Sequence, residues 1–139
     1  MSLVWNLLNL RGKVFEIMKI LLVEDDVFFQ KFYSNKLKEN KAEVEIASNG
    51  EEGLARMKSF IPDLVLLDLI MPKMDGFAVL TARSQDPILS KIPVIVFSTL
   101  GQEKDVQTAQ KLGANGYINK GFFDFNSMVA TINQVMKSR

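Results

Sequence analysis

Short apolar runs alternate with longer segments of helical periodicity along most of this chain. The runs predict strands at 19–23, 44–48, 64–67, 93–97 and 116–119. The segments between and after them predict helices at 28–37, 50–59, 75–83, 103–112 and 128–136. Because the central runs are apolar throughout, both faces of the sheet should be covered, as in parallel sheets. We therefore predict an α/β fold with one doubly wound, five-stranded parallel sheet and helices on both faces.

Local sequence signals mark several of the predicted helix ends. Ser48 and Glu51 have the spacing of a capping box, which places the start of the second helix near Gly50. Asp75 can cap the third helix with its side chain, and Gly113 is a helix stop signal. These signals divide the chain into short elements with short connections, without internal repeats or a second domain.

Polar side chains directly follow four of the five predicted strands. They are Glu24, Asp25 and Asp26 after the first strand, Asp68 after the third, Ser98 and Thr99 after the fourth, and Lys120 after the fifth. In an open parallel sheet, ligands bind beyond the carboxyl ends of the strands. We therefore expect these side chains to form the functional site.

The residue types in this set indicate which chemistry the site can perform. If the first and third strands are neighbours, about 4.8 Å apart, Glu24, Asp25 and Asp68 converge on one pocket. A hard divalent cation would relieve the repulsion between these carboxylates, and oxygen ligands favour Mg²⁺, with Mn²⁺ as the other candidate. Lys120 and Ser98 add a positive charge and a hydroxyl donor, so the set suits a phosphoryl group.

Composition excludes several other kinds of chemistry. The 139 residues include no Cys and no His, which rules out disulfides, Ser-His or Cys-His nucleophile pairs and His-ligated or Cys-ligated zinc. The absence of Cys fits a reducing compartment, and we expect a cytoplasmic location. Seventeen basic and sixteen acidic residues give a net charge of +1, so we expect no direct nucleic acid binding and no membrane partner.

Residues 1–17 differ from the rest of the chain. They contain an apolar stretch with Leu3, Val4 and Trp5, which is far shorter than the roughly 20 residues of a membrane span. Two interpretations remain open for this N-terminal extension. It is a vector scar or the product of an upstream start, or it is a short amphipathic helix that docks on the domain or on a second copy. The domain itself is expected to cover residues 18–139.

Four sequence motifs together resemble a known family. The motifs ILLVEDD, LVLLDLIMPKMDG, PVIVFST and GANGYINKG resemble the receiver domain of bacterial two-component response regulators, the CheY-like domains. The resemblance covers Met18 to about Lys137. It implies a flavodoxin-like strand order of 2-1-3-4-5 and a signalling switch rather than an enzyme. The implied partners are a histidine kinase or phosphotransfer protein and a downstream protein target. A dimer could also form through the face made by the last two predicted helices and the strand between them.

The resemblance also implies roles for the residues at the strand ends. Asp68 matches the phosphoacceptor, which takes a phosphoryl group from a phosphohistidine of the partner. Glu24 and Asp25 match the acidic pair that holds Mg²⁺ together with Asp68, and the backbone carbonyl of Ile70 would be another ligand. Asp26 falls one place too late for the pair and is interpreted as a helix cap.

Three further positions match the response to phosphorylation. Lys120 matches the lysine that contacts the phosphoryl group. Ser98 matches the hydroxyl residue that moves toward it, and Tyr117 matches the aromatic residue whose burial follows that movement. Moving these groups can repack the predicted helix 103–112, the strand 116–119 and the helix 128–136, so that a local change at Asp68 alters a distant surface.

Several positions depart from the family pattern. Gly121 stands where the family usually has a proline in cis linkage, so the loop after Lys120 is expected to be looser. Thr99 is larger than the usual small residue and could narrow the access to Asp68. Ile70 and Leu100 occupy positions that tune phosphoryl lifetime, and neither can orient an attacking water. We therefore hypothesise a persistent phosphoryl group.

Other functional classes fit the sequence less well. A phosphatase with an Asp-x-Asp nucleophile motif would need an acid at Ile70. A flavodoxin-like FMN carrier would need a hydroxyl-rich loop after the first strand, where the acidic run from Glu24 to Asp26 would repel phosphate. The main alternative is a receiver-like interaction module that signals without phosphorylation.

Overall fold

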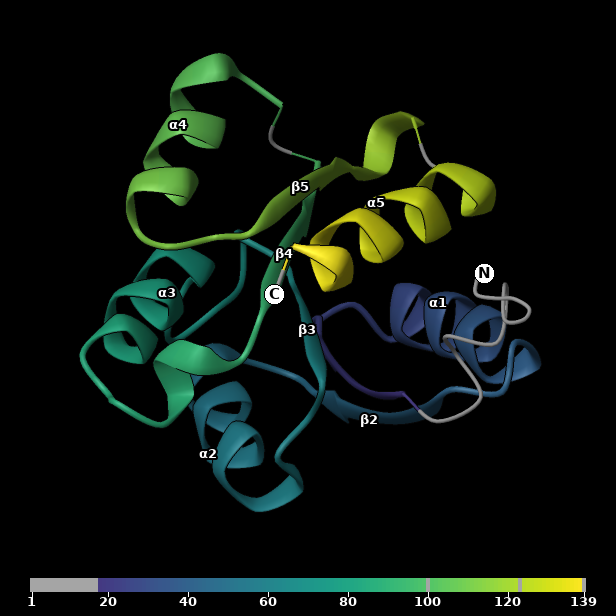
Figure 1. Cartoon of the computed structure of the whole chain (residues 1–139), viewed down its shortest axis with the longest axis horizontal. Helices are drawn as coiled ribbons and strands as arrows, with labels where there is room; N and C mark the ends of the chain where they lie inside the picture. Colours follow the sequence, from purple (N-terminus) through teal and green to yellow (C-terminus); the bar gives the residue numbers. More distant parts are fainter. Residues whose placement is uncertain (1–17, 100, 123, 139) are drawn as a thin grey trace.

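Five parallel strands form one sheet in a computed structural model that describes residues 18–99, 101–122 and 124–138. The strands are β1 (Lys19–Val23), β2 (Glu43–Ala47), β3 (Leu64–Leu67), β4 (Val94–Ser98) and β5 (Gly116–Asn119). Their order is β2-β1-β3-β4-β5 (Figure 1). The predicted parallel sheet and its flavodoxin-like order are confirmed, and β1 is indeed the neighbour of β3.

Helices cover both faces of this sheet, as predicted. They are α1 (Val27–Glu39), α2 (Gly50–Phe60), α3 (Gly76–Ser84), α4 (Glu103–Lys111) and α5 (Phe125–Lys137). Helices α1 and α5 lie on one face, and α2, α3 and α4 lie on the other (Figure 1). Two short 3₁₀ helices, η2 (Leu89–Lys91) and η3 (Lys120–Phe122), were not foreseen from the sequence.

The hydrophobic core consists of two layers separated by the sheet. Successive strand residues point to opposite faces, so Leu21 and Val23 join one cluster while Ile20 and Leu22 join the other. Strands β3 and β4 are buried along their whole length. This double burial explains why their sequences are apolar throughout, and it holds the residues at their ends in fixed positions.

The cap of α1 agrees with the sequence signal, and the cap of α2 differs from it. Asp26 caps α1, because its carboxylate accepts from two backbone N–H groups of the first turn. Helix α2 is capped by Asn49, whose side chain accepts from the N–H of Glu52, and the carboxylate of Glu52 accepts from the N–H of Ser48. The predicted pairing of Ser48 with Glu51 was therefore wrong by one residue. Ser and Asn cap helices about equally well, so the adjacent pair left the register ambiguous.

Two other boundary signals hold, and two strands are shifted by one residue. Asp75 caps α3 by accepting from the N–H of Ala78 at 2.9 Å. Gly113 adopts a φ of 103° just after α4, a conformation that favours glycine. Strand β2 runs from residue 43 to 47 instead of 44 to 48, and β4 runs from 94 to 98 and thus includes Ser98.

Candidate functional site

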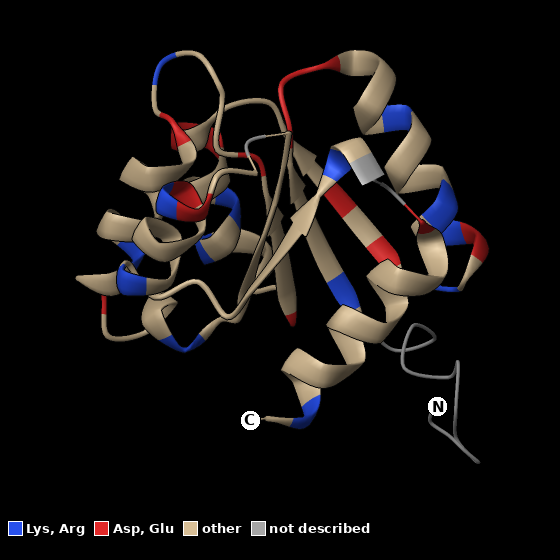
Figure 2. Cartoon of the chain, turned by 90° about the horizontal axis from the view of Figure 1, so that it is seen from above, with Lys and Arg blue, Asp and Glu red and all other residues tan. Residues whose placement is uncertain are grey.

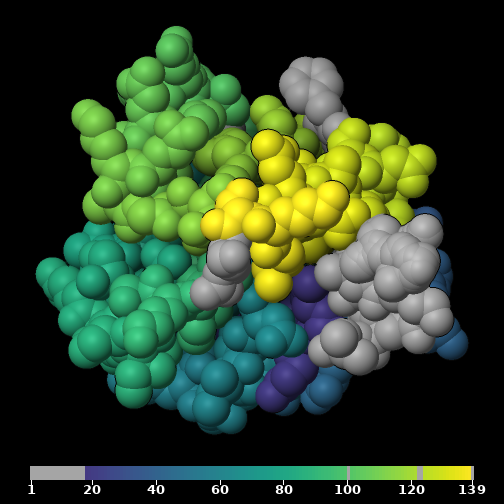
Figure 3. Space-filling view, in the orientation of Figure 1, coloured from purple at the N-terminus to yellow at the C-terminus, as the bar shows by residue number. Residues whose placement is uncertain are grey.

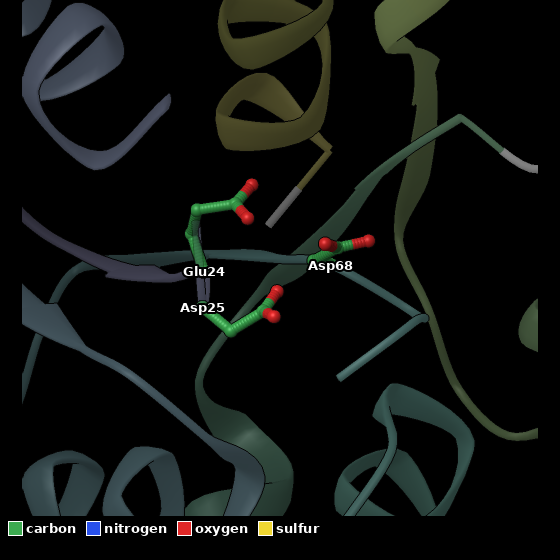
Figure 4. Close-up of side chains that lie close together, drawn as sticks. All are labelled: Glu24, Asp25 and Asp68. Carbon is green, nitrogen blue, oxygen red and sulfur yellow. The ribbon is translucent and has the colours of Figure 1, made fainter. Parts of the chain in front are cut away.

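The ends of β1 and β3 bring three carboxylates together. Glu24 follows β1 and is 1% exposed, and Asp68 follows β3 and is 8% exposed, whereas Asp25 is open to solvent. The backbone fixes both buried residues, because Glu24 N–H donates to Ala47 and Asp68 N–H donates to Val23. Carboxylate oxygens of the three residues lie within 4.8 Å of one another (Figure 4).

Lys120 reaches this acidic group from the first residue of η3. Its ammonium group bonds to the Glu24 carboxylate and lies 3.4 Å from Asp68 Oδ2. The Lys120 side chain is only 5% exposed, and its Nζ lies 5.2 Å from the ring centroid of Phe29 and 5.4 Å from that of Phe97. The cation is therefore held by two carboxylates and two aromatic faces, in surroundings that strengthen each interaction.

Burial sets the protonation behaviour around the site. It raises the pKa of Glu24, and the hydrogen bonds from Lys120 and from the N–H of Asp26 oppose that rise. Burial also raises the pKa of Tyr33, and the negative charges of Glu24 and Asp68 add to it. The site thus disfavours additional negative charge unless a cation is present.

The loop after β3 holds the carboxylate of Asp68 and approaches its backbone closely. The N–H of Ile70 donates to Asp68 Oδ1 at 3.2 Å. The chain comes back beside Asp68 at Gly76, whose N–H donates to Leu69 O at 3.0 Å. A Cβ on Gly76 would lie 2.5 Å from Asp68 O, too close for any side chain. The Asp-Gly pair at the start of α3 therefore permits the loop that positions Asp68.

Ser98 and Tyr117 occupy the side of the site formed by β4 and β5. Ser98 is fully buried at the end of β4, opposite Asn119 in the register. Tyr117 is half-buried and packs against the core layer of α2, α3 and α4. Burial raises the pKa of Tyr117, with smaller contributions from Asp105 and Asp68. Ser98 is thus on the strand next to β3, and Tyr117 is on the strand beyond it, which leads to Lys120.

The departures from the family pattern fall in different places. Thr99 is exposed after β4, and Ile70 is 53% exposed after β3. Leu100 lies outside the described residues. Gly121 donates its N–H to Asn119 Oδ1 at 2.7 Å, a bond that proline could not make. The side chain of Asn119 thus supports the loop that carries Lys120.

Three parts of this arrangement were not found from the sequence. They are the aromatic faces of Phe29 and Phe97, the N–H of Ile70 and the side chain of Asn119. The two phenylalanines look like ordinary core residues, and only their position beside Lys120 distinguishes them. Asn119 precedes Lys120 directly, and a polar residue at the end of a short strand was the one available signal.

The donor set suits a hard divalent cation. The three clustered side chains offer only carboxylate oxygens, the ligands that Mg²⁺ and Mn²⁺ prefer. A cation would also remove the penalty that burial imposes on ionised Glu24. Glu24, Asp25 and Asp68 are therefore the described residues that could hold such an ion.

Comparison with known proteins identifies the family. The family model of the response regulator receiver domain matches residues 20–133. The chain belongs to this family. It is a CheY-like receiver domain of the kind used in two-component signal transduction, a family of signalling switches rather than classical enzymes.

Individual relatives support this assignment. The transcriptional regulator RpaA of Synechocystis is 33% identical over 86% of this chain and 49% of its own length. CheY4 of Vibrio cholerae superposes with a TM-score of 0.79 at 27% identity, covering 85% of this chain and 98% of CheY4. The Mn²⁺-bound form of response regulator Rcp1 has a TM-score of 0.70 at 32% identity, covering 82% of this chain and 88% of Rcp1.

The relatives differ from this chain in length. The chain spans about half the length of several curated relatives that it matches, among them RpaA. Within the described residues, the helices are all too short or too polar to cross a membrane.

Proposed function

We propose that this receiver domain accepts a phosphoryl group on Asp68 and thereby changes its binding to a downstream protein. The donor would be a phosphohistidine of a histidine kinase or phosphotransfer protein. The observation that carries this proposal is the convergence of Asp68 with two further carboxylates and Lys120 at the ends of β1, β3 and β5. On this proposal the domain works in the cytoplasm as a switch and catalyses at most its own phosphorylation and dephosphorylation.

The surroundings of Asp68 support its role as the nucleophile. Its Oδ1 accepts from Ile70 N–H, while its Oδ2 faces Lys120 at 3.4 Å. In the transfer, a carboxylate oxygen of Asp68 would attack phosphorus as the bond from phosphorus to the imidazole nitrogen breaks. The electron pair of that bond stays on the imidazole of the partner. Lys120 could then turn from Glu24 toward the phosphoryl oxygens, whose charge it would partly neutralise.

We further propose that Glu24, Asp25, Asp68 and the backbone carbonyl of Ile70 hold Mg²⁺, with Mn²⁺ as the other candidate. When bound, such an ion would offset the charges of the carboxylates and of the incoming phosphoryl oxygens. Support comes from the clustered carboxylates and from Rcp1, whose solved structure is described as a Mn²⁺-bound form. The contribution of the chain is to hold Glu24 buried and ionisable beside Asp68.

The proposed switch uses Ser98, Lys120 and Tyr117. Ser98 would move toward the phosphoryl group, and Tyr117 would become more buried in response. The face formed by α4, β5 and α5 would then present an altered surface to a downstream protein or to a second copy in a dimer. Ser98 is buried at the end of β4, the strand that pairs with β3, and Tyr117 has room to change because it is only half-buried.

The lifetime of the phosphoryl group is a separate part of the proposal. Ile70 and Leu100 are apolar and would not orient an attacking water, and Thr99 would narrow the access to Asp68. We therefore propose slow dephosphorylation. Loss of label from phosphorylated protein would measure it, and complete decay within seconds would show that these three positions do not protect the phosphoryl group.

Intact mass measurement after incubation with acetyl phosphate and Mg²⁺ tests the central proposal. We expect the mass of one phosphoryl group on the wild-type chain and none on Asp68→Asn. Asp75→Asn is the matched control, since Asp75 caps α3 with its side chain and lies outside the proposed site. An adduct that persists in Asp68→Asn would refute the assignment. No adduct under any condition would instead support an interaction module that signals without phosphorylation.

A further inference from the structure

Arg83 is a buried cation in the last turn of α3, away from the site around Asp68. It is 4% exposed, and arginine is almost never fully buried unless its donors have partners. The residues that it contacts include Ile92 before β4 and Asn115 before β5, at the end of the sheet opposite to Asp68. Figure 2 shows these two ends, with the acidic loop before α1 at the Asp68 end and the end of α5 at the other.

The guanidinium group of Arg83 reaches oxygen atoms of three segments. Its Nε and Nη2 donate to Ile92 O at 2.9 and 2.7 Å, just before β4. Longer bonds of 3.4 Å reach Gly113 O, just after α4, and Asn115 Oδ1, just before β5. Asn115 extends this connection, because its Oδ1 accepts from Val94 N–H at 2.9 Å and its N–H donates to Val94 O at 2.8 Å. Arg83 thus ties the end of α4 and the start of β5 to the start of β4.

Helix α4 is attached to the rest of the domain mainly at this same end. Ala109 is the one buried residue among 103–111, whereas each of the other four α-helices has three or four. The carbonyl of Ala109 accepts from Ala114 N–H at 2.9 Å, so the buried turn leads directly to the residues around Arg83. Glu103 and Lys104 in the first turn are exposed. Figure 3 shows α4, in green, projecting at the edge of the molecule.

The middle of α4 lies close to Tyr117, a residue of the proposed switch. Tyr117 is half-buried and packs against the core layer that contains Ala109. The pKa of Tyr117 is raised first by burial and then by the negative charge of Asp105, which lies in α4. A change in the burial of Tyr117 is therefore expected to move α4, and the N-terminal end is the one with less buried surface to hold it.

We propose that Arg83 is a positioning residue of the switch, which fixes the C-terminal end of α4 and the start of β5 as a pivot. Helix α4 then opens from its N-terminal end, which follows β4 and Ser98 in the chain, while the end at Gly113 stays in place. The use of this pivot by Asp68 rests on the phosphorylation proposed above, whereas the pivot itself belongs to the unphosphorylated chain.

Arginine has the chemistry that such an anchor needs. Its planar group presents five donors in a rigid fork, so one side chain can hold several carbonyl oxygens at once, which the single nitrogen of lysine cannot do. Gly113 contributes to the fit, because its φ of 103° favours glycine and a Cβ there would lie 3.1 Å from Arg83 Nη1. The carbonyls that follow a helix also carry partial negative charge, which stabilises a buried cation beside them.

Residue-resolved hydrogen exchange, measured by NMR, tests the pivot in the unphosphorylated chain. In the wild type, we expect the N–H groups of Ala114 and Asn115 to be protected at least about tenfold more than that of Gln107, which is exposed in α4. Arg83→Met keeps an apolar stem but removes the guanidinium group. Protection of Ala114 and Asn115 should then fall at least about tenfold relative to the amides of β3, which report the stability of the whole domain.

Three further variants keep this test specific. Arg83→Lys retains the charge but cannot reach all the acceptors, so it should lose part of the protection, and it decides the question if circular dichroism shows that Arg83→Met is unfolded. Asn115→Asp keeps an acceptor oxygen beside the guanidinium group and should retain the protection. Arg56→Met is the matched control, because Arg56 is 40% exposed and pairs with Glu45 at the surface. It should leave Ala114 and Asn115 unchanged.

Repeating the measurement after incubation with acetyl phosphate and Mg²⁺ relates the pivot to Asp68. In the phosphorylated wild type, we expect the protection of Gln107 to change while that of Asn115 stays the same. In Arg83→Lys the change should extend to Asn115. A chain that takes up no phosphoryl group would refute the proposed function, and the unphosphorylated measurement would still decide whether the pivot exists.

Three results would overturn the proposal. The first is equal protection of Gln107 and Asn115 in the wild-type chain. The second is protection of Ala114 and Asn115 that stays constant relative to β3 in the folded Arg83 variants, which would give Arg83 no specific hold on this end. The third is a phosphorylated wild-type chain in which Asn115 changes as much as Gln107, because α4 would then move as a whole.

Discussion

Replacing Lys120 by Met tests the main electrostatic feature of the site. Met keeps an apolar stem against Phe29 and Phe97 but removes the cation that contacts Glu24 and Asp68. Without a divalent cation in solution, Glu24 is then 1% exposed and lacks its cationic partner. Removing one member of a buried pair is strongly destabilising, because the other charge remains buried.

The loss of stability through Glu24 has an upper limit, since the carboxyl group can avoid the penalty by binding a proton. Between the ordinary glutamate pKa of 4.5 and pH 7, proton uptake costs about 3.4 kcal/mol, at 1.36 kcal/mol per pH unit. We therefore expect the free energy of unfolding of Lys120→Met to fall by about 3 kcal/mol at pH 7 in the absence of metal. Added Mg²⁺ should recover part of this loss by binding to the carboxylates.

The same variant should acquire a characteristic pH dependence. Burial already raises the pKa of Glu24, and removing the hydrogen bond from Lys120 raises it further. Between pH 4.5 and the raised value, the folded variant binds one more proton than the unfolded chain. Its stability is therefore greatest at the acidic end of this window and decreases by about 1.4 kcal/mol per pH unit as the pH rises.

Urea unfolding followed by circular dichroism, with chelator present and at several pH values, measures these effects. Lys36→Met is the matched control, because Lys36 lies 5.9 Å from the Phe32 ring on α1, away from the three clustered carboxylates. The control should change the stability by less than about 0.5 kcal/mol. Adding Glu24→Gln to Lys120→Met should restore stability and abolish the pH slope. A Lys120→Met loss no larger than the control, or a loss that Glu24→Gln does not repair, would refute this account.

Three further substitutions test the supports of the fold and site. Gly76→Ala adds a Cβ that would lie 2.5 Å from Asp68 O, so it should destabilise the domain by about 1–3 kcal/mol in urea unfolding and slow phosphorylation by acetyl phosphate. Asp26→Ala removes the cap of α1 and should cost about 1 kcal/mol in thermal unfolding, whereas Asp26→Asn should retain most of it. Hydrogen bonds from two backbone N–H groups near η2 lower the pKa of Asp86, so its stabilisation is present above the unfolded pKa of 3.8 and is lost as pH falls through the folded pKa. Thermal unfolding of Asp86→Asn should lack this acid-dependent loss.

The sheet could be predicted from sequence because its strands are buried on both faces. A run such as 64–67 has no polar position to spoil the pattern, and the acidic or basic residue after it marks where the strand ends. The convergence of Glu24 and Asp68 then follows from the pairing of β1 with β3. Register at the helix starts was harder, since Ser48 and Asn49 are both suitable caps and the chain uses the second.

Other features depend on contacts that no local pattern encodes. The bond from Lys120 to Glu24 joins residues 96 positions apart in the chain, and the two rings beside Lys120, of Phe29 and Phe97, come from two other elements. The left-handed conformation of Ile61 contradicts its own intrinsic preference, so sequence reasoning would place another residue there. Positions of this kind are where local preference and tertiary or functional demands conflict.

The packing of the strands indicates which of them can move when Asp68 is phosphorylated. Strands β3 and β4 are buried along their length, whereas all four residues of β5 are half-buried. Lys120 continues directly from β5, and the next residue is tied to Asn119 through a hydrogen bond of 2.7 Å. If Lys120 turns from Glu24 to a phosphoryl group, β5 can move with it more easily than β3 or β4, because β5 is half-buried and lies at the edge of the sheet. We therefore expect the proposed conformational change to be transmitted through β5 and Tyr117, because a shift of β3 would disturb both core layers at once.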